Sequence, residues 1–304
     1  MGALRVIAAH GKLALVVGLM AGLFLPGLAQ VIRPFIPHLI AALLMVTAAR
    51  VGWRDASGGL RGVAATLVLV VVYQVAMPLA VAVPAAVLGV TGVPLVMAVC
   101  LLLAAPSVTG APNFAILLGQ DPAPAMRLLI LGTLVFPVTV LPVLWLLPQV
   151  SGFGDLAGAS ARFAVLIGGA AMAGFVLREV CFARLGDDGR AALDGVAAVL
   201  LAVVVVGLMS AIGPALAADP WRLAGWAVVA VAVNFGLQVG AALVMGQGRA
   251  TPARAIVAGN RNIALMLLAL PEEITTPLLI FIGCYQIPMY LTPVVMRDFY
   301  RRLA

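Results

Sequence analysis

The stretch Gly259-Asn260-Arg261-Asn262 lies inside a mostly apolar run from about residue 251 to residue 270. One arginine at the centre of a membrane helix costs about 2.5 to 3.5 kcal/mol on insertion, so a cluster of polar side chains there is not stable against lipid. It must face protein or a water-filled cavity. Because ionisable residues at membrane depth mark functional sites by default, we expect Arg261 to lie at the centre of one.

The composition indicates a membrane protein. Of the 304 residues, 64% are hydrophobic and only 10% are charged, whereas soluble domains have roughly 45 to 50% apolar and 25% charged residues. Basic residues outnumber acidic ones, but they are spread over loops and are not interleaved with aromatic residues, so no nucleic-acid partner is expected. Cys100, Cys181 and Cys284 are an odd number and far apart, which implies neither a disulfide framework nor a metal motif.

Apolar runs of about 20 residues predict an all-α polytopic membrane protein with ten transmembrane helices. We place the first five at about residues 11–29, 34–52, 62–88, 93–119 and 123–148. The second five are expected at about residues 160–178, 191–217, 221–246, 251–270 and 274–297. The order of charged, apolar and small residues at the N-terminus also fits a cleavable signal peptide, which stays open as an alternative to a first span.

Charge predicts the orientation in the membrane. Ten spans place both termini on one side, and most of the 18 lysines and arginines fall in the loops of that side. The opposite side carries only Arg33, Arg162 and Arg222. By the positive-inside rule, both termini are expected in the cytoplasm, with the protein integral to the cell's inner membrane.

The fourth span cannot be one regular helix. Pro106, Gly110 and Pro112 lie close together within it, and each proline removes a backbone donor and clashes with the preceding turn. The ninth span is expected to break at Gly259. Irregular backbone at membrane depth is tolerated only where it is buried in protein or lines a cavity, so both breaks point to a site.

The two breaks occupy matching places in the two halves of the chain. Both read Gly-x-x-Asn, at residues 110–113 and 259–262, and they lie equally far from the starts of the halves 11–148 and 160–297. Because each half has an odd number of spans, five, the second half enters the membrane from the opposite face and is inverted relative to the first. Paired interruptions in two inverted repeats indicate the substrate site of a secondary transporter, where the broken helices 4 and 9 cross.

Several motifs resemble those of the bile acid:sodium symporter family. They are Tyr-Gln-Val-Ala-Met-Pro at residues 73–78, Ala-Pro-Ser-Val-Thr-Gly-Ala-Pro-Asn at 105–113, Phe-Pro at 136–137 and Arg-Asn at 261–262. The resemblance covers nearly the whole chain. It implies a core domain of helices 3–5 and 8–10, a panel domain of helices 1, 2, 6 and 7, and alternating access around the crossing. It also implies an organic anion as substrate and two sodium ions behind the crossing.

The resemblance extends only partly to the sodium ligands. Gln74 and Asn113 match two of them, but the family's ninth-span glutamate falls at about Val257 and the following glutamine is Arg261. No hydroxyl stands at the fifth-span positions, and Thr133 is the nearest. Hard cations want several oxygen donors, preferably including a carboxylate. The sodium sites are therefore expected to be degenerate, and no cofactor is expected.

Three roles are open for Arg261. In the first role, it is a fixed cation in the place of sodium that braces the crossing through Asn113, Asn260 and Asn262. In the second, it binds a substrate carboxylate bidentately. In the third, it is a structural residue that satisfies helix-end carbonyls. Asn234 and Gln238, four residues apart in the eighth span, either line the crossing or join two helices. The candidate substrate-binding or ion-binding residues are Gln74, Thr109, Asn113, Asn234, Gln238, Asn260, Arg261 and Asn262.

Together these features predict a secondary active transporter of a small organic anion, without family-type sodium coupling and as a monomer or weak homo-oligomer in the bilayer. A sodium-coupled symporter with a rebuilt ion site is the first alternative. A metalloid exporter that uses Cys100 and a passive channel are alternatives of another class. An enzyme is not expected, because the spans show no nucleophile with a base, no paired carboxylates and no metal cluster.

Overall fold

The computed structural model describes residues 11–56, 62–148, 152–181 and 186–303, and these ranges are almost entirely helical. Seven helices are long and apolar enough to cross a membrane. They cover Pro26–Arg50, Val63–Val87, Ala123–Leu144, Phe153–Cys181, Ala191–Ala218, Pro220–Met245 and Glu272–Val295. The chain is thus an all-α integral membrane protein.

The helices of residues 11–148 are short or interrupted. They are α2 (Gly11–Phe24), α3 (Pro26–Ile32), η1 (Arg33–Phe35), α4 (Ile36–Ala56), α5 (Val63–Val71), the π-turn η2 (Val72–Ala76), α6 (Met77–Val87), α7 (Pro94–Ala104), α8 (Ala111–Leu117), α9 (Ala123–Thr139) and α10 (Leu141–Leu144).

Longer helices dominate the second part of the chain. They are α11 (Phe153–Cys181), α12 (Asp187–Leu208), η3 (Met209–Ala211), α13 (Ile212–Ala218), α14 (Pro220–Met245), α15 (Thr251–Gly259), η4 (Ile263–Leu268), α16 (Glu272–Val295) and α17 (Arg297–Leu303).

Proline placement corrects the predicted ends of the first two spans. The predicted first span ends at residue 29, but α2 ends at Phe24 and a new helix starts at Pro26. The following apolar helix runs from Pro26 to Arg50 rather than from residue 34, because the prolines at 26, 34 and 37 each stand in the first turn of a helical segment, where proline is tolerated. The signal-peptide alternative falls partly on residues 1–10, which lie outside the described residues.

The sixth predicted span also begins earlier than expected. It was expected at about residue 160, but α11 begins at Phe153, with Asp155 in its first turn. A carboxylate at this position stabilises a helix start through the helix dipole.

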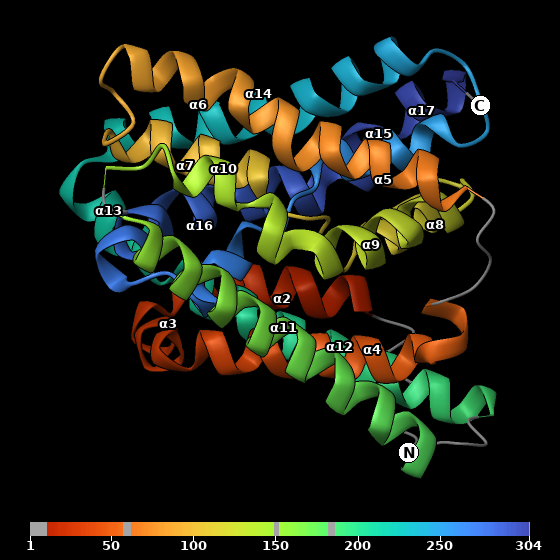
Figure 1. The fold of residues 1–304 in the computed structure, drawn as a ribbon. Helices are drawn as coiled ribbons and strands as arrows, with labels where there is room; N and C mark the ends of the chain where they lie inside the picture. Colours follow the sequence, from red (N-terminus) through yellow and green to blue (C-terminus); the bar gives the residue numbers. More distant parts are fainter. Residues whose placement is uncertain (1–10, 57–61, 149–151, 182–185, 304) are drawn as a thin grey trace.

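Two groups of helices pack against each other (Figure 1). In the first group, α11 lies along α4, and α12 lies between α2 and α4. Glycines allow these close approaches: a Cβ at Gly174 would lie 2.2 Å from the Met45 carbonyl oxygen, and one at Gly18 would lie 2.7 Å from that of Ala202. In the second group, α14 packs on α15 and α16, α5 on α9, and α6 on α7.

The two interruptions lie side by side in the second group. The Val108 N–H donates to the Asn260 carbonyl at 2.9 Å, and the Asn262 N–H donates to the Pro106 carbonyl at 2.8 Å. Ser107 and Arg261 form an isolated antiparallel bridge between them. Each break thus satisfies the other's free backbone groups, which is why irregular backbone is stable at this depth.

Candidate functional site

Arg261 lies at the ends of two helices. Its side chain is buried, its Nε donates to the Ala258 carbonyl at 2.8 Å, and its Nη1 donates to the Ala105 carbonyl at 3.1 Å. Ala258 is in the last turn of α15 and Ala105 directly follows α7. Helix C-termini carry partial negative charge, so the guanidinium is stabilised by two helix dipoles as well as by the two hydrogen bonds.

The rest of the guanidinium is enclosed by less polar groups. Nη2 lies 3.9 Å from the Met77 sulfur, and the guanidinium carbon lies over the Tyr73 ring, 4.8 Å from its centroid. A cation over an aromatic face is attracted to the ring's electrons. Within the described ranges, Arg261 has no carboxylate partner. Its charge is therefore balanced by dipoles and a ring rather than by an ion pair.

Of the predicted partners of Arg261, the helix-end carbonyls are found and the three asparagines are not. Its hydrogen bonds go to main-chain carbonyls and not to Asn113, Asn260 or Asn262. Asn113 is exposed on α8, because the buried face of that short helix is formed by the residues on either side of it. The Asn260 side chain donates back to the Ile256 carbonyl at 2.8 Å. Asn262 is half-buried and lines a pocket.

Gln74 forms its hydrogen bond with a residue other than Asn113. It is buried in the π-turn η2, and its Oε1 accepts a hydrogen bond from the Thr139 hydroxyl at 2.6 Å. A Cβ at Gly132 would lie only 2.5 Å from the Gln74 Nε2, so α9 fits against this side chain only through a glycine. With Gln74 engaged and Asn113 exposed, these residues do not fit a sodium site of the family type.

Asn234 and Gln238 bind the end of α15 from α14, and both are fully buried. The Asn234 Nδ2 donates to the Gly259 carbonyl, and the Gln238 Nε2 donates to the Asn234 Oδ1 at 2.8 Å. A Cβ at Gly259 would lie 2.2 Å from the Asn234 carbonyl oxygen, so only glycine permits this approach. Asn234 and Gln238 thus do both things that the sequence left open. They reach the break at the end of α15, and they join α14 to α15 and α16.

Three residues of α16 and α17 complete the same hydrogen-bond network. The Tyr285 hydroxyl donates to the Gly259 carbonyl, and the Thr292 hydroxyl donates to the Asn260 Oδ1 at 3.2 Å. The Tyr300 hydroxyl donates to the Gln238 Oε1 at 2.9 Å. Burial raises the pKa of Tyr300, so its phenol stays protonated and remains a donor.

Sequence reasoning missed several members of the site. Thr139 stands eight residues beyond the positions where hydroxyls were sought, and only the tertiary packing brings it to Gln74. Tyr285, Thr292 and Tyr300 were not among the candidate residues. A signal did exist, because Tyr285 and Thr292 are seven residues apart in an apolar helix and so share one face.

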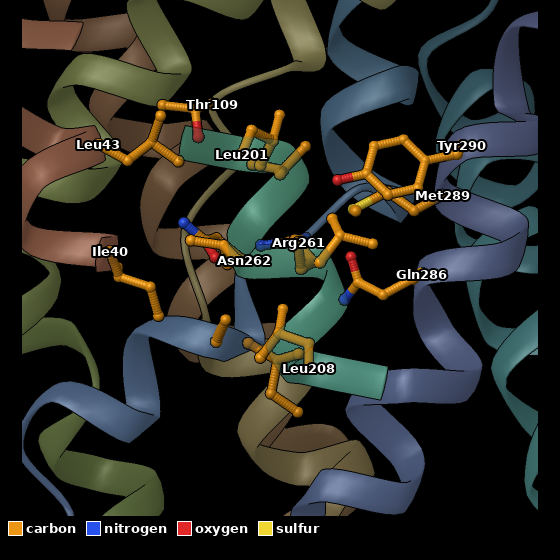
Figure 2. Close-up of a pocket in the computed structure, with 15 residues that line it drawn as sticks. Ile40, Leu43, Thr109, Leu201, Leu208, Arg261, Asn262, Gln286, Met289 and Tyr290 are labelled. Atoms are coloured by element: carbon orange, nitrogen blue, oxygen red, sulfur yellow. The ribbon is translucent and has the colours of Figure 1, made fainter. Parts of the chain in front are cut away.

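A pocket lies between the two helix groups beside the paired breaks. Its cavity volume is about 30 Å³. Figure 2 shows Ile40 and Leu43 on one side, Leu201 and Leu208 of α12, and Met289 of α16 on the other side. The polar residues of its wall are Thr109, Arg261, Asn262, Gln286 and Tyr290. The pocket thus combines an apolar wall with a few polar groups, as is usual for sites that bind small molecules.

Tyr290 is an unusual member of this wall. Its hydroxyl is buried and has no hydrogen-bond partner within the part of the chain that the structure describes. Figure 2 shows the hydroxyl turned away from its own helix and toward the pocket. An unpaired buried hydroxyl costs about 1 to 3 kcal/mol, so this group is suited to bind a ligand atom or water.

Cys100 does not belong to the pocket. It is fully buried in the apolar helix α7 and lies in the hydrophobic core. Among the described residues, no three His, Cys, Asp or Glu side chains lie together as metal ligands would. A metalloid site at Cys100 thus gains no support from this geometry.

A scan of protein-family models finds no match for this sequence, and a search of curated proteins finds none either. The functional reading therefore depends on the residues themselves.

Proposed function

We propose that this protein is a secondary active transporter of a small organic anion that works by alternating access. The observation that carries the proposal is the pairing of two interrupted segments, one from each half of the chain, around a buried arginine and beside a pocket. Interrupted helices at matching places in two inverted halves are typical of transporter substrate sites. In this proposal, ten transmembrane segments form inverted repeats over residues 11–148 and 160–297.

The two helix groups correspond to the moving parts. The group of α2, α4, α11 and α12 is the panel, and the group that contains the breaks is the core. The pocket lies on their boundary, so a shift of one group against the other would change its access. The proposal includes a relationship to the bile acid:sodium symporter family, with both termini in the cytoplasm and the protein in the inner membrane.

Arg261 favours transport that does not need sodium. Its guanidinium already supplies a positive charge to the carbonyls of Ala105 and Ala258. A sodium ion 4 Å away would be repelled by about 4 kcal/mol at an effective dielectric constant of 20. The carbonyls of Ala105 and Ala258 occupy the Nη1 and Nε donors, so this geometry fits a fixed cation or a structural residue at the helix ends better than bidentate binding of substrate.

The charge also favours an anionic substrate. With no carboxylate partner among the described residues, Arg261 leaves the site positive. An anion in the pocket would lie near this charge, and Thr109, Asn262 and Tyr290 offer hydrogen bonds to it. The apolar wall suits the organic part of the ligand. The cavity volume of about 30 Å³ is well below the roughly 300 to 1,000 Å³ of sites that bind small molecules, so the anion can enter only if the two helix groups move apart.

Counterflow in proteoliposomes tests the proposal. Organic anions, including pantoate and taurocholate, are first screened for those that raise the thermal stability of the purified protein, and a stabilising anion is then radiolabelled. We expect saturable uptake that is accelerated by unlabelled anion inside the vesicle, equally in sodium and in choline. Flux that neither saturates nor counter-exchanges indicates a channel, and uptake that requires a sodium gradient indicates the sodium-coupled alternative. A screen in which no organic anion stabilises the protein contradicts the proposed substrate class.

A further inference from the structure

A second pocket lies at the end of the molecule where α13 leads into α14. It is an open pocket lined by α3, η1, η3, α13 and α16, and its volume is about 370 Å³. Its polar residues are Gln30, Arg33, Ser210 and Thr276, and the rest of the wall is apolar. This pocket is separate from the one beside the breaks and shares no wall residue with it.

Arg33 supplies an available guanidinium at this pocket. The side chain is half-buried, and Nη2 donates to the Thr276 hydroxyl at 3.4 Å. Within the described ranges it forms no ion pair, although Glu272 and Glu273 stand in the first turn of α16. Both glutamates are exposed. Because a guanidinium has five N–H donors in a planar fork, most of the binding capacity of Arg33 remains free.

Ser210 adds a second unsatisfied group. Its hydroxyl is buried and has no hydrogen-bond partner among the described residues, while its carbonyl accepts from the Gln30 Nε2 at 3.4 Å. A buried hydroxyl without a partner is destabilising. Arg33 and Ser210 thus place two polar groups with unused hydrogen-bonding capacity at one pocket.

The surroundings place this pocket at the edge of the hydrocarbon. Two large aromatic side chains are exposed at the same end of the molecule, Phe35 at 58% and Trp221 at 87%. Tryptophan is enriched at the level of the lipid headgroups, so of these two side chains Trp221 is the one that indicates this level. Below Arg33, the apolar wall continues along α13 and over Leu279 and Ile280 of α16. A cationic group at headgroup level above an apolar wall matches the two ends of a phospholipid.

We propose that this pocket binds an anionic phospholipid of the surrounding bilayer. The phosphate lies against the Arg33 guanidinium and the Thr276 hydroxyl, and an acyl chain lies along α13 and α16. Arginine binds phosphate bidentately, and the expected orientation places Arg33 on the side opposite the termini, so the lipid belongs to that leaflet. The site does not depend on the transport proposal, since it is formed by other residues.

Native mass spectrometry of the delipidated protein tests this site, with phosphatidylglycerol and phosphatidylcholine titrated separately. Arg33→Gln removes the phosphate ligand. Arg222→Gln is the matched control, because Arg222 lies at the same end but over the Trp226 ring, 5.8 Å from its centroid, and outside the pocket. We expect wild type and Arg222→Gln to prefer phosphatidylglycerol, and Arg33→Gln to lose about fivefold in its affinity for that lipid.

A second variant keeps the test decisive if Arg33→Gln does not fold. Ala215→Trp retains Arg33 and fills the apolar wall, so it should lose the same lipid. Equal binding of the two lipids by wild type overturns the proposal, as does unchanged binding of phosphatidylglycerol by both variants. Glycerol 3-phosphate that competes as well as the lipid also overturns it, because the pocket would then be a site for a soluble anion.

Discussion

Arg261 is the residue on which the site depends. It bridges the last turn of α15 and the end of α7 through the carbonyls of Ala258 and Ala105. The sequence predicted a buried arginine and offered helix-end carbonyls as one of three kinds of partner. It could not identify Ala105 and Ala258, because those bonds depend on the tertiary position of two helix ends. A residue of the same size without donors would leave both carbonyls unpaired.

Arg261→Met should destabilise the protein. Each carbonyl left buried without a partner costs about 1 to 3 kcal/mol, so the melting temperature in detergent should fall clearly. Arg261→Lys is the control, since it keeps the charge and reaches fewer carbonyls, and it should melt between the two. Equal melting of Arg261→Met and wild type would show that these bonds add nothing to stability.

Gly259→Ala tests the close approach of α14 to the break. The new methyl group would meet the Asn234 carbonyl and the Gln238 side chain, and overpacking of this kind costs about 1 to 3 kcal/mol. Gly240→Ala is the control, because nothing lies within 4 Å of its Cβ position. There the gain in helix propensity of about 1 kcal/mol should raise thermal stability. If Gly259→Ala melts no lower than Gly240→Ala, the packing described for Gly259 is wrong.

At the scale of elements, hydrogen bonds from α14, α16 and α17 hold the end of α15. The network runs from Tyr300 through Gln238 and Asn234 to Gly259. Helix–helix packing in lipid lacks a hydrophobic driving force, so such polar bonds and close contacts fix the arrangement. The C-terminal helix α17 is thereby tied to the centre of the site.

Tyr300→Phe should loosen α17. It removes the bond to Gln238, worth about 0.5 to 1.5 kcal/mol, and leaves a buried amide oxygen with one partner fewer. Tyr290→Phe makes the same chemical change where the hydroxyl has no partner, so its thermal stability should equal or exceed that of wild type. Hydrogen exchange in α17 and thermal melts distinguish the two, and equal effects of both changes would contradict the network.

The breaks could be predicted from sequence, whereas other elements could not. Pro106, Gly110 and Pro112 forbid a regular helix locally, and a buried arginine next to Gly259 indicates irregular backbone. The helix start at Pro26 and the π-turn at Val72–Ala76 were missed. Proline signals both the end of one helix and the start of another, and a π-turn depends on how a side chain such as Gln74 packs against a neighbouring helix.

At the scale of the whole molecule, the two helix groups touch near η3. A Cβ at Gly283 of α16 would lie 2.7 Å from side-chain carbons of Ile212, which lies in the span Ala191–Ala218 that continues α12 of the first group. Arg33 bonds to Thr276 across the same boundary. Alternating access as we propose it requires these contacts to open during each cycle.

A cross-link at this boundary should stop transport. In a protein without native cysteines, Ile212→Cys with Gly283→Cys should form a disulfide that blocks counterflow, and a reducing agent should restore it. Ile36→Cys with Gly207→Cys is the control. A Cβ at Gly207 would lie 2.8 Å from a side-chain carbon of Ile36, which is a similarly close approach. Both of these residues, however, belong to one helix group. Full transport by the first cross-linked pair would contradict relative motion of the two groups.

The most direct test of the central claim is the thermal stability of the wild-type protein in sodium and in choline at matched ionic strength. A ligand at a hundredfold its Kd stabilises the folded state by about 2.7 kcal/mol, which a melting curve resolves. If Arg261 supplies the cation of this site, sodium and choline give the same melting temperature. A clearly higher melting temperature in sodium means that the protein binds this ion and that Arg261 does not take its place.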